Sequence, residues 1–180
     1  MLLEWAEIPF AVMISHADES FSPENNPVNV ALEIAKIKNR AIVNMQGFIK
    51  SDHIVISADT IVVLDQKVIG KPIDRDDAIS ILSKLSGRKH TVITAVCISS
   101  DDREVLFHEE TEVEFHVLTP SQIEHYVDAY QPYDKAGAYA IQEWIGVIGI
   151  KQIKGDFYNV MGLPVSSVIR TLNESFSFNF

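Results

Sequence analysis

Residues 53–64 read HIVISADTIVVL, a stretch rich in Ile and Val that predicts a buried β-strand with one carboxylate inside it. The carboxylate belongs to Asp59, within Ser57-Ala58-Asp59-Thr60. An unpaired buried carboxylate is costly, so Asp59 needs a partner, a metal ion or a raised pKa. These residues alone leave two interpretations open, a structural Asp satisfied by nearby donors and a catalytic carboxylate.

Helical and strand patterns alternate along the rest of the chain. Asn26-Pro27, Asp74, Thr119 and Pro164 are helix-start signals, each followed by apolar residues at helical spacing. Further strands are expected at residues 8–14, 90–99, 105–118, 138–142 and 147–153. The pattern predicts one α/β domain over residues 1–180, with a mixed central β-sheet flanked by helices.

Composition excludes several classes of protein. The chain has 180 residues, with 15 basic and 25 acidic side chains, so its net charge is −10. An acidic surface disfavours a nucleic-acid polymer as partner but allows a small anionic ligand at a local cluster of cations. Cys97 is the single cysteine, which excludes an intramolecular disulfide and a CxxC motif. With no long apolar run and no secretory signal, the expected compartment is the cytoplasm, without a membrane partner.

Short polar segments predict where chemistry occurs. Lys71 lies in Gly70-Lys71-Pro72, Arg88 in Ser86-Gly87-Arg88, Lys135 in Asp134-Lys135-Ala136-Gly137, and Asp156 in Gly155-Asp156-Phe157. Each segment alone is typical of a turn. Together they offer cations for phosphate oxygens and, with Asp59, carboxylates that bind a metal or activate water, which favours phosphoanhydride hydrolysis. The P-loop, GxSxG and HExxH patterns are absent from the sequence.

In these segments the sequence resembles the Maf family of nucleotide pyrophosphatases, whose fold is similar to that of inosine triphosphatases. The motifs that carry the resemblance are Ser57-Ala58-Asp59-Thr60, Gly70-Lys71-Pro72, Leu85-Ser86-Gly87-Arg88-Lys89-His90, Asp134-Lys135-Ala136-Gly137-Ala138-Tyr139, Ile141-Gln142, Gly155-Asp156-Phe157 and Asn159-Val160-Met161-Gly162-Leu163-Pro164. The resemblance implies hydrolysis of a nucleoside triphosphate to the monophosphate and pyrophosphate with a divalent cation, Mg²⁺ or Mn²⁺.

The resemblance also implies roles for individual residues. Asp59 matches the general base. The expected substrate-binding residues are Lys38, Thr60, Lys71, Arg88, Lys135 and Gln142, of which Thr60 and Gln142 match positions tied to substrate choice. The expected metal ligands are Glu19, Asp59 and Asp156.

Lys135 together with Gln142 resembles the subgroup that acts on dTTP and UTP, and 7-methyl-GTP is the alternative substrate. In the family, a strand and a Ser-x-Ser-Pro-Arg-Arg loop precede the helix that residues 1–4 match, so both are expected to be missing here. This departure keeps open a second class of function, a nucleotide-binding protein without catalysis. The expected partner is a nucleoside triphosphate, and the oligomeric state stays open, with a homodimer as one candidate.

Overall fold

The computed structural model describes residues 2–15, 17, 26–45, 48 and 53–178. Its elements, in chain order, are α1 (Leu2–Trp5), α2 (Pro27–Val43), β1 (Val55–Leu64), β2 (Lys67–Ile69), α3 (Arg75–Leu85), β3 (Lys89–Ser99), β4 (Glu104–Phe115), α4 (Pro120–Tyr130), the 3₁₀ helix η2 (Ala136–Ala138), α5 (Trp144–Gly149), β5 (Ile150–Lys154), α6 (Phe157–Val160) and α7 (Val165–Phe176). The α/β class predicted from the sequence is confirmed.

In the described part of the chain the strands form one sheet in the order β2-β1-β3-β4-β5. Each of its pairings is antiparallel, so the expectation of a mixed sheet does not hold for these strands. The connections explain the difference. A two-residue turn reverses β1 into β2, and the chain then passes through α3 and re-enters at the end where β1 finished. A parallel neighbour would instead need a crossover along the whole strand.

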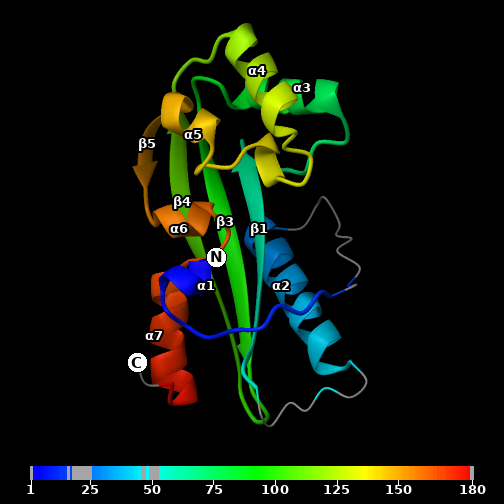
Figure 1. Ribbon diagram of the computed structural model, residues 1–180, viewed down its shortest axis with the longest axis vertical. Helices are drawn as coiled ribbons and strands as arrows, with labels where there is room; N and C mark the ends of the chain where they lie inside the picture. Colours follow the sequence, from blue (N-terminus) through cyan, green and yellow to red (C-terminus); the bar gives the residue numbers. More distant parts are fainter. Residues whose placement is uncertain (1, 16, 18–25, 46–47, 49–52, 179–180) are drawn as a thin grey trace.

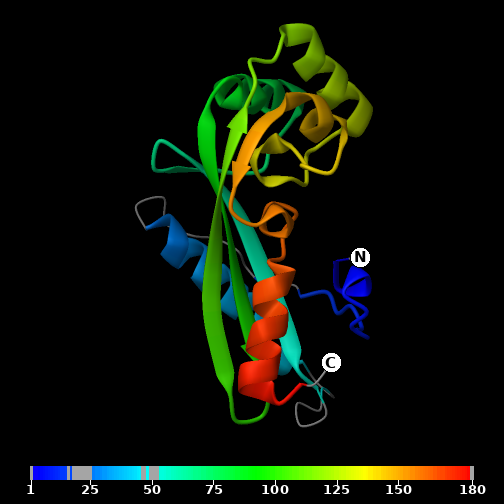
Figure 2. The ribbon, with the colours of Figure 1, turned by 90° about the vertical axis from the view of Figure 1, so that its left-hand side faces the viewer.

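Helices α2 and α7 cover opposite faces of the long strands β1, β3 and β4 (Figure 2). The alternation of side chains along β3 produces the two faces, because successive residues of a strand point to opposite sides. Ala95 and Cys97 pack in the cluster under α2, whereas Val96 and Ile98 pack in the cluster with α7. Small residues on the first face let α2 approach the sheet closely.

Helices α3, α4 and α5 gather at the other end of the sheet (Figure 1). They enclose a core that includes the fully buried side chains of Leu82, Leu85, Phe115, Tyr126 and Ile145. Burying a side chain of this size stabilises the fold by about 1.5–3 kcal/mol. The molecule therefore has a helical end with its own core and a long sheet end clamped between two helices.

The helix starts predicted from the sequence are confirmed. The Asn26 side chain accepts the N–H of Val28 at 2.9 Å, and Asp74 accepts the N–H of Asp77 at 2.8 Å. Thr119 forms a complete capping box at the start of α4. Each such cap contributes about 1 kcal/mol by satisfying N–H groups that the helix cannot bond internally.

Three predicted strands differ from the structure. Residues 8–14 form no strand. Residues 138–141 are buried, but the left-handed backbone of Gly137 and Ala138 interrupts an extended conformation at their start. Residues 147–149 belong to α5, and only 150–154 form a strand. A short buried apolar run cannot be assigned to strand or helix by periodicity alone.

No helix within the described ranges is both long enough and apolar enough to cross a bilayer.

Candidate active site

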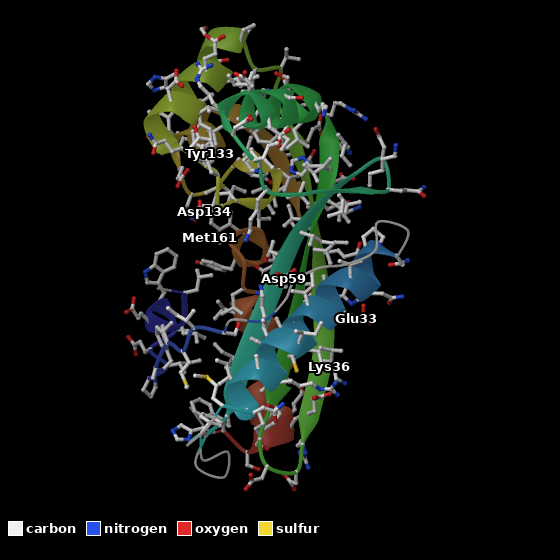
Figure 3. The ribbon with its side chains drawn as sticks, turned by 90° about the vertical axis from the view of Figure 1, so that its right-hand side faces the viewer. Glu33, Lys36, Asp59, Tyr133, Asp134 and Met161 are labelled. Atoms are coloured by element: carbon white, nitrogen blue, oxygen red, sulfur yellow. The ribbon has the colours of Figure 1, made fainter. Side chains whose placement is uncertain are left out.

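A cavity of about 250 Å³ opens at the edge of β1, between α2 and the helical end of the molecule. Figure 3 shows three of its residues along one side, Asp59 on β1, Met161 after α6 and Asp134 before η2, with Glu33 and Lys36 further along α2. The lining residues are Lys38, Ala58, Asp59, Thr60, Val62, Lys71, Val92, Asp134, Lys135, Ala136, Tyr139, Ala140, Gln142, Val160, Met161 and Gly162.

The position of the cavity follows from where β2 ends. β2 pairs with β1 only at Val62, Val63 and Leu64, so within the described residues β1 is an edge strand before Val62. Asp59 and Thr60 are consecutive and therefore point to opposite faces of the sheet. Both line the same cavity because it wraps around this edge. An edge strand thus gives one ligand access to side chains from both faces.

Asp59 forms an ion pair with Lys38, whose Nζ lies 2.7 Å from Asp59 Oδ1. The two side chains are 11% and 20% exposed, so the charges interact in a partly desolvated environment and attract more strongly than at the surface. Helix α2 brings Lys38 to this point by packing on β1 and β3 through small residues such as Ala31 and Ala35. The buried carboxylate predicted from the sequence therefore has its partner, a cation 21 residues earlier.

A second group of charges lies on the opposite wall. Lys135 Nζ is 2.8 Å from Asp134 Oδ2, and this hydrogen bond is the main cause that holds the Asp134 pKa below its usual range. The charge of Lys71 lowers the same pKa further, so both ammonium groups lie near one carboxylate. The Gly137 N–H donates to the Gly70 carbonyl at 3.2 Å and ties the two loops together. The arrangement presents two cations to the cavity beside the Lys38–Asp59 pair.

Thr60 belongs to a chain of hydrogen bonds that crosses the sheet. Its Oγ1 lies 2.8 Å from Thr94 Oγ1, and the Thr94 hydroxyl donates to the backbone carbonyl of Asn159 at 2.9 Å. The Asn159 amide in turn donates to the Val92 carbonyl and to Thr111 Oγ1. Thr94 and Asn159 are fully buried. These hydrogen bonds therefore hold the hydroxyl of Thr60 and the helix α6 in place on the sheet.

Gln142 lies in a segment held by the buried Tyr126 of α4. The Tyr126 hydroxyl accepts the N–H of Ala140 at 3.1 Å and donates to the carboxylate of Glu143. Burial, and then this carboxylate, raise the pKa of Tyr126. Gly146 lets the helix that follows approach the same segment, because a Cβ there would meet the Ile141 carbonyl oxygen at 1.8 Å. The backbone on both sides of Gln142 is therefore fixed.

The oxygen atoms of the cavity suit a magnesium-like cation better than a zinc site. No group of three or more His, Cys, Asp or Glu side chains forms a metal cluster within the described ranges. Mg²⁺ is usually held by one or two carboxylates together with water and substrate phosphates rather than by a protein cage. The carboxylate of Asp59, facing a cavity that also presents three lysines, fits a cation brought in with a phosphate chain.

The structure brings together six of the residues predicted from the sequence, namely Lys38, Asp59, Thr60, Lys71, Lys135 and Gln142. Arg88 and Asp156 do not line the cavity. Arg88 donates to the carboxylate of the exposed Asp65 at 2.7 Å, and Asp156 caps α6 by accepting the Tyr158 N–H at 2.7 Å. Glu19 lies outside the described residues. The roles assigned to these three residues stay predictions.

Sequence reasoning missed several residues of the cavity wall. Asp134, Tyr139 and Met161 belong to motifs that the sequence singled out, so their positions gave a usable signal. Val62 and Val92 look like ordinary core residues on β-strands and gave none. Their side chains reach the cavity only because it opens over the face of the sheet beside Thr60.

Comparison with known proteins shows the family of this chain. The family model described as Maf-like protein matches residues 1–175, and the chain belongs to the Maf family. Among its curated relatives, a protein of Christiangramia forsetii is 42% identical over 93% of this chain and 84% of its own length. A protein of Bacillus cereus strain G9842 is 40% identical over 96% and 88%, and one of Cytophaga hutchinsonii is 43% identical over 98% and 79%. All three relatives are named dTTP/UTP pyrophosphatase.

Proposed function

We propose that this protein is a nucleoside triphosphate pyrophosphatase that hydrolyses dTTP and UTP to the monophosphate and pyrophosphate. The observation that carries the proposal is a partly buried carboxylate, Asp59, in one cavity with three lysines, Lys38, Lys71 and Lys135. Family membership and the name shared by the curated relatives support the same reaction and the same substrates.

The lysines suit the phosphate chain. Lys71 and Lys135 stand on the loops opposite β1, where their ammonium groups can contact phosphate oxygens and stabilise the charge that develops as the anhydride bond breaks. These local cations oppose the net charge of −10, which would otherwise repel a triphosphate. The cavity therefore attracts an anionic substrate, whereas the rest of the acidic surface does not.

Asp59 is the proposed general base. It removes a proton from the water that attacks the phosphate chain, and Lys38 keeps its carboxylate oriented through the 2.7 Å contact. We further propose that Asp59 binds a divalent cation, Mg²⁺ or Mn²⁺, together with the substrate phosphates. When bound, such a cation supplies charge neutralisation at the phosphate oxygens.

The test is pyrophosphate release by the purified protein from dTTP, UTP and 7-methyl-GTP, with Mg²⁺ or Mn²⁺. We expect release from dTTP and UTP, and loss of about 10²–10⁴-fold in kcat in the Asp59→Asn variant. The matched control is Asp128→Asn, an exposed carboxylate that pairs with Arg75 outside the cavity and should leave kcat unchanged.

Other results would change the conclusion. Preferential release from 7-methyl-GTP would move the protein to the alternative substrate. Tight nucleotide binding in a calorimeter without any release would make it a binding protein. Unchanged turnover in Asp59→Asn would remove the general-base role from Asp59.

A further inference from the structure

We infer that Asn39 on α2 and Ser57 on β1 are positioning residues for the proposed reaction: they fix α2 on the sheet so that Lys38 stays in contact with Asp59. Neither Asn39 nor Ser57 lines the cavity, so both act through Lys38 rather than on the substrate. The inference rests on the proposed function and deepens it by assigning what holds the ion pair in place.

Asn39 is the polar member of a row of small buried residues on α2. Ala31, Ala35 and Asn39 follow one another at intervals of four, so they lie on the same side of the helix. All three are buried, and the two alanines belong to the apolar cluster between α2 and the sheet. A buried amide costs free energy unless it is hydrogen-bonded, so Asn39 requires polar partners on the sheet that an alanine would not.

The Asn39 side chain finds these partners on both strands beneath α2. Its amide nitrogen donates to the Val55 carbonyl of β1 at 3.1 Å and to the Cys97 carbonyl of β3 at 3.2 Å. Its oxygen accepts the Ser99 hydroxyl at 2.7 Å. A flipped amide would place its oxygen against two carbonyl groups, so this orientation is the stable one. Asn39 therefore ties one point of α2 to two neighbouring strands at once.

Ser57 makes a second tie one helical turn away. Its hydroxyl donates to the backbone carbonyl of Ala35 at 2.7 Å. Ser57 and Asp59 are two residues apart on β1, so their side chains point to the same face of the sheet. Ala35 comes three residues before Lys38, and Asn39 directly follows it. The helix is thus fixed to the sheet on both sides of Lys38.

These hydrogen bonds constrain α2 in a way that its apolar contacts do not. Apolar burial is non-directional, so a row of alanines alone allows a helix to slide along a sheet. Hydrogen bonds weaken steeply when their distance or angle changes. A slide of one residue along the helix axis is about 1.5 Å, enough to break the 2.7 Å contact between Lys38 and Asp59 unless the lysine changes conformer.

The test compares kcat for pyrophosphate release from dTTP in the wild-type protein and in Asn39→Ala, which extends the row of alanines and removes the hydrogen bonds. Misplacement of a catalytic group by about 1 Å can cost about 100-fold in rate. The flexible stem of Lys38 absorbs part of such a shift, so we expect kcat to fall roughly tenfold. KM should change little, because Lys71 and Lys135 on the opposite wall are unaltered.

Ser167→Ala is the matched control for lost stability. The Ser167 hydroxyl donates to Glu109 Oε1 at 2.6 Å and ties α7 to the sheet outside the cavity lining. Urea unfolding measures the stability of each variant, and kcat is compared at a temperature at which both variants remain folded. Asn39→Ala should lose turnover and Ser167→Ala should keep it. Equal kcat in the two variants would overturn the inference.

A double-mutant cycle separates positioning from a general structural role. If Asn39 acts only through Lys38, its loss has no further effect on turnover once Lys38 has been replaced. The double variant Lys38→Met/Asn39→Ala should therefore be as slow as Lys38→Met alone, whereas losses that multiply would refute the inference. If Asn39→Ala does not fold, Ser57→Ala removes the second tie and takes its place in the cycle, where multiplied losses would refute the inference equally.

A measurement without catalysis distinguishes the failure of this inference from the failure of the proposed function. Urea unfolding of Lys38→Met, Asp59→Asn and their double variant gives the coupling free energy between the two charges. The same cycle is then repeated with Asn39→Ala present in every protein. A favourable coupling that becomes clearly smaller with Asn39→Ala supports the positioning role even if the wild-type protein releases no pyrophosphate. An unchanged coupling refutes it whatever the activity.

Discussion

Lys38 Nζ lies 2.7 Å from Asp59 Oδ1, across the interface between α2 and the edge of β1, in a pair that is mostly withdrawn from water. Helix and strand meet there through alanines on α2, so the distance between the charges depends on how closely the two elements pack. This contact connects the packing of the sheet end with the proposed chemistry.

Replacing Lys38 should impair turnover more than stability. In Lys38→Met the carboxylate of Asp59 loses the cation that orients it, and we expect kcat to fall roughly 100-fold, as when one fixed donor is removed from a catalytic site. Lys36→Met is the matched control, since Lys36 lies on the same helix but pairs with Glu104 outside the cavity. Steady-state pyrophosphate release measures both. Equal losses in the two variants would show that the effect is not specific to the site.

The lysines of the opposite wall should act on substrate affinity. Lys71→Ala and Lys135→Ala each remove one cation from the cavity, and we expect KM for dTTP to rise roughly tenfold in each. The rise should shrink at high ionic strength, because screening weakens the attraction that each lysine provides in the wild-type protein.

Two nearby cations serve as comparisons for these lysines. Lys67→Ala, on the exposed start of β2, should leave KM unchanged. Arg88→Ala should raise KM less than Lys71→Ala, since Arg88 is paired with Asp65 and does not line the cavity. A larger effect at Arg88 would show that it reaches the substrate when the nucleotide is bound.

Gly146 should tolerate no side chain. The Cβ of Gly146→Ala would stand 1.8 Å from the Ile141 carbonyl oxygen, so the segment that holds Gln142 must shift. Overpacking of this kind typically costs about 1–3 kcal/mol, which urea unfolding would measure. Gly70→Ala is the control, because a Cβ there meets nothing within 4 Å and the variant should be as stable as the wild type. Equal stability of both variants would contradict the rigid packing at Gly146.

His90 should make the fold sensitive to acid. Burial lowers the pKa of His90 to about 4 from its ordinary 6.5, and its Nε2 lies 2.8 Å from the Tyr139 hydroxyl. Below pH 6.5 the unfolded chain binds a proton that the folded chain does not accept until about pH 4, so stability falls as pH decreases through this window. The predicted loss is roughly 2 kcal/mol between pH 7 and pH 5.

The measurement is the free energy of unfolding in urea at pH 7 and pH 5. His90→Gln removes the titrating group and should lose less stability over this interval than the wild type does. His108→Gln removes a more exposed histidine on β4 and should behave like the wild type. An identical pH dependence in all three proteins would contradict the prediction.

Local sequence patterns predicted the helices α2, α3, α4 and α7. The caps at Asn26, Asp74 and Thr119 act within four residues of themselves, so the chain needs no distant contact to begin these helices. The strand predictions that failed depend instead on contacts between residues far apart in the sequence. Residues 138–141 are apolar because they belong to the core around Tyr126. Their backbone is bent at Gly137 and Ala138, which no alternation of apolar and polar residues reveals.

The candidate site likewise combines features that follow from the local sequence with contacts that only the fold creates. The sequence by itself determined which residue types were available: a carboxylate inside an apolar strand, lysines in turns, and glycines where the backbone must bend. Only the tertiary structure decided that Lys38 pairs with Asp59, that β2 ends early enough to expose both faces of β1, and that the hydroxyl of Thr60 meets that of Thr94. Caps and turns are satisfied by neighbours along the chain, whereas buried charges and hydroxyls take their partners from whatever element packs against them.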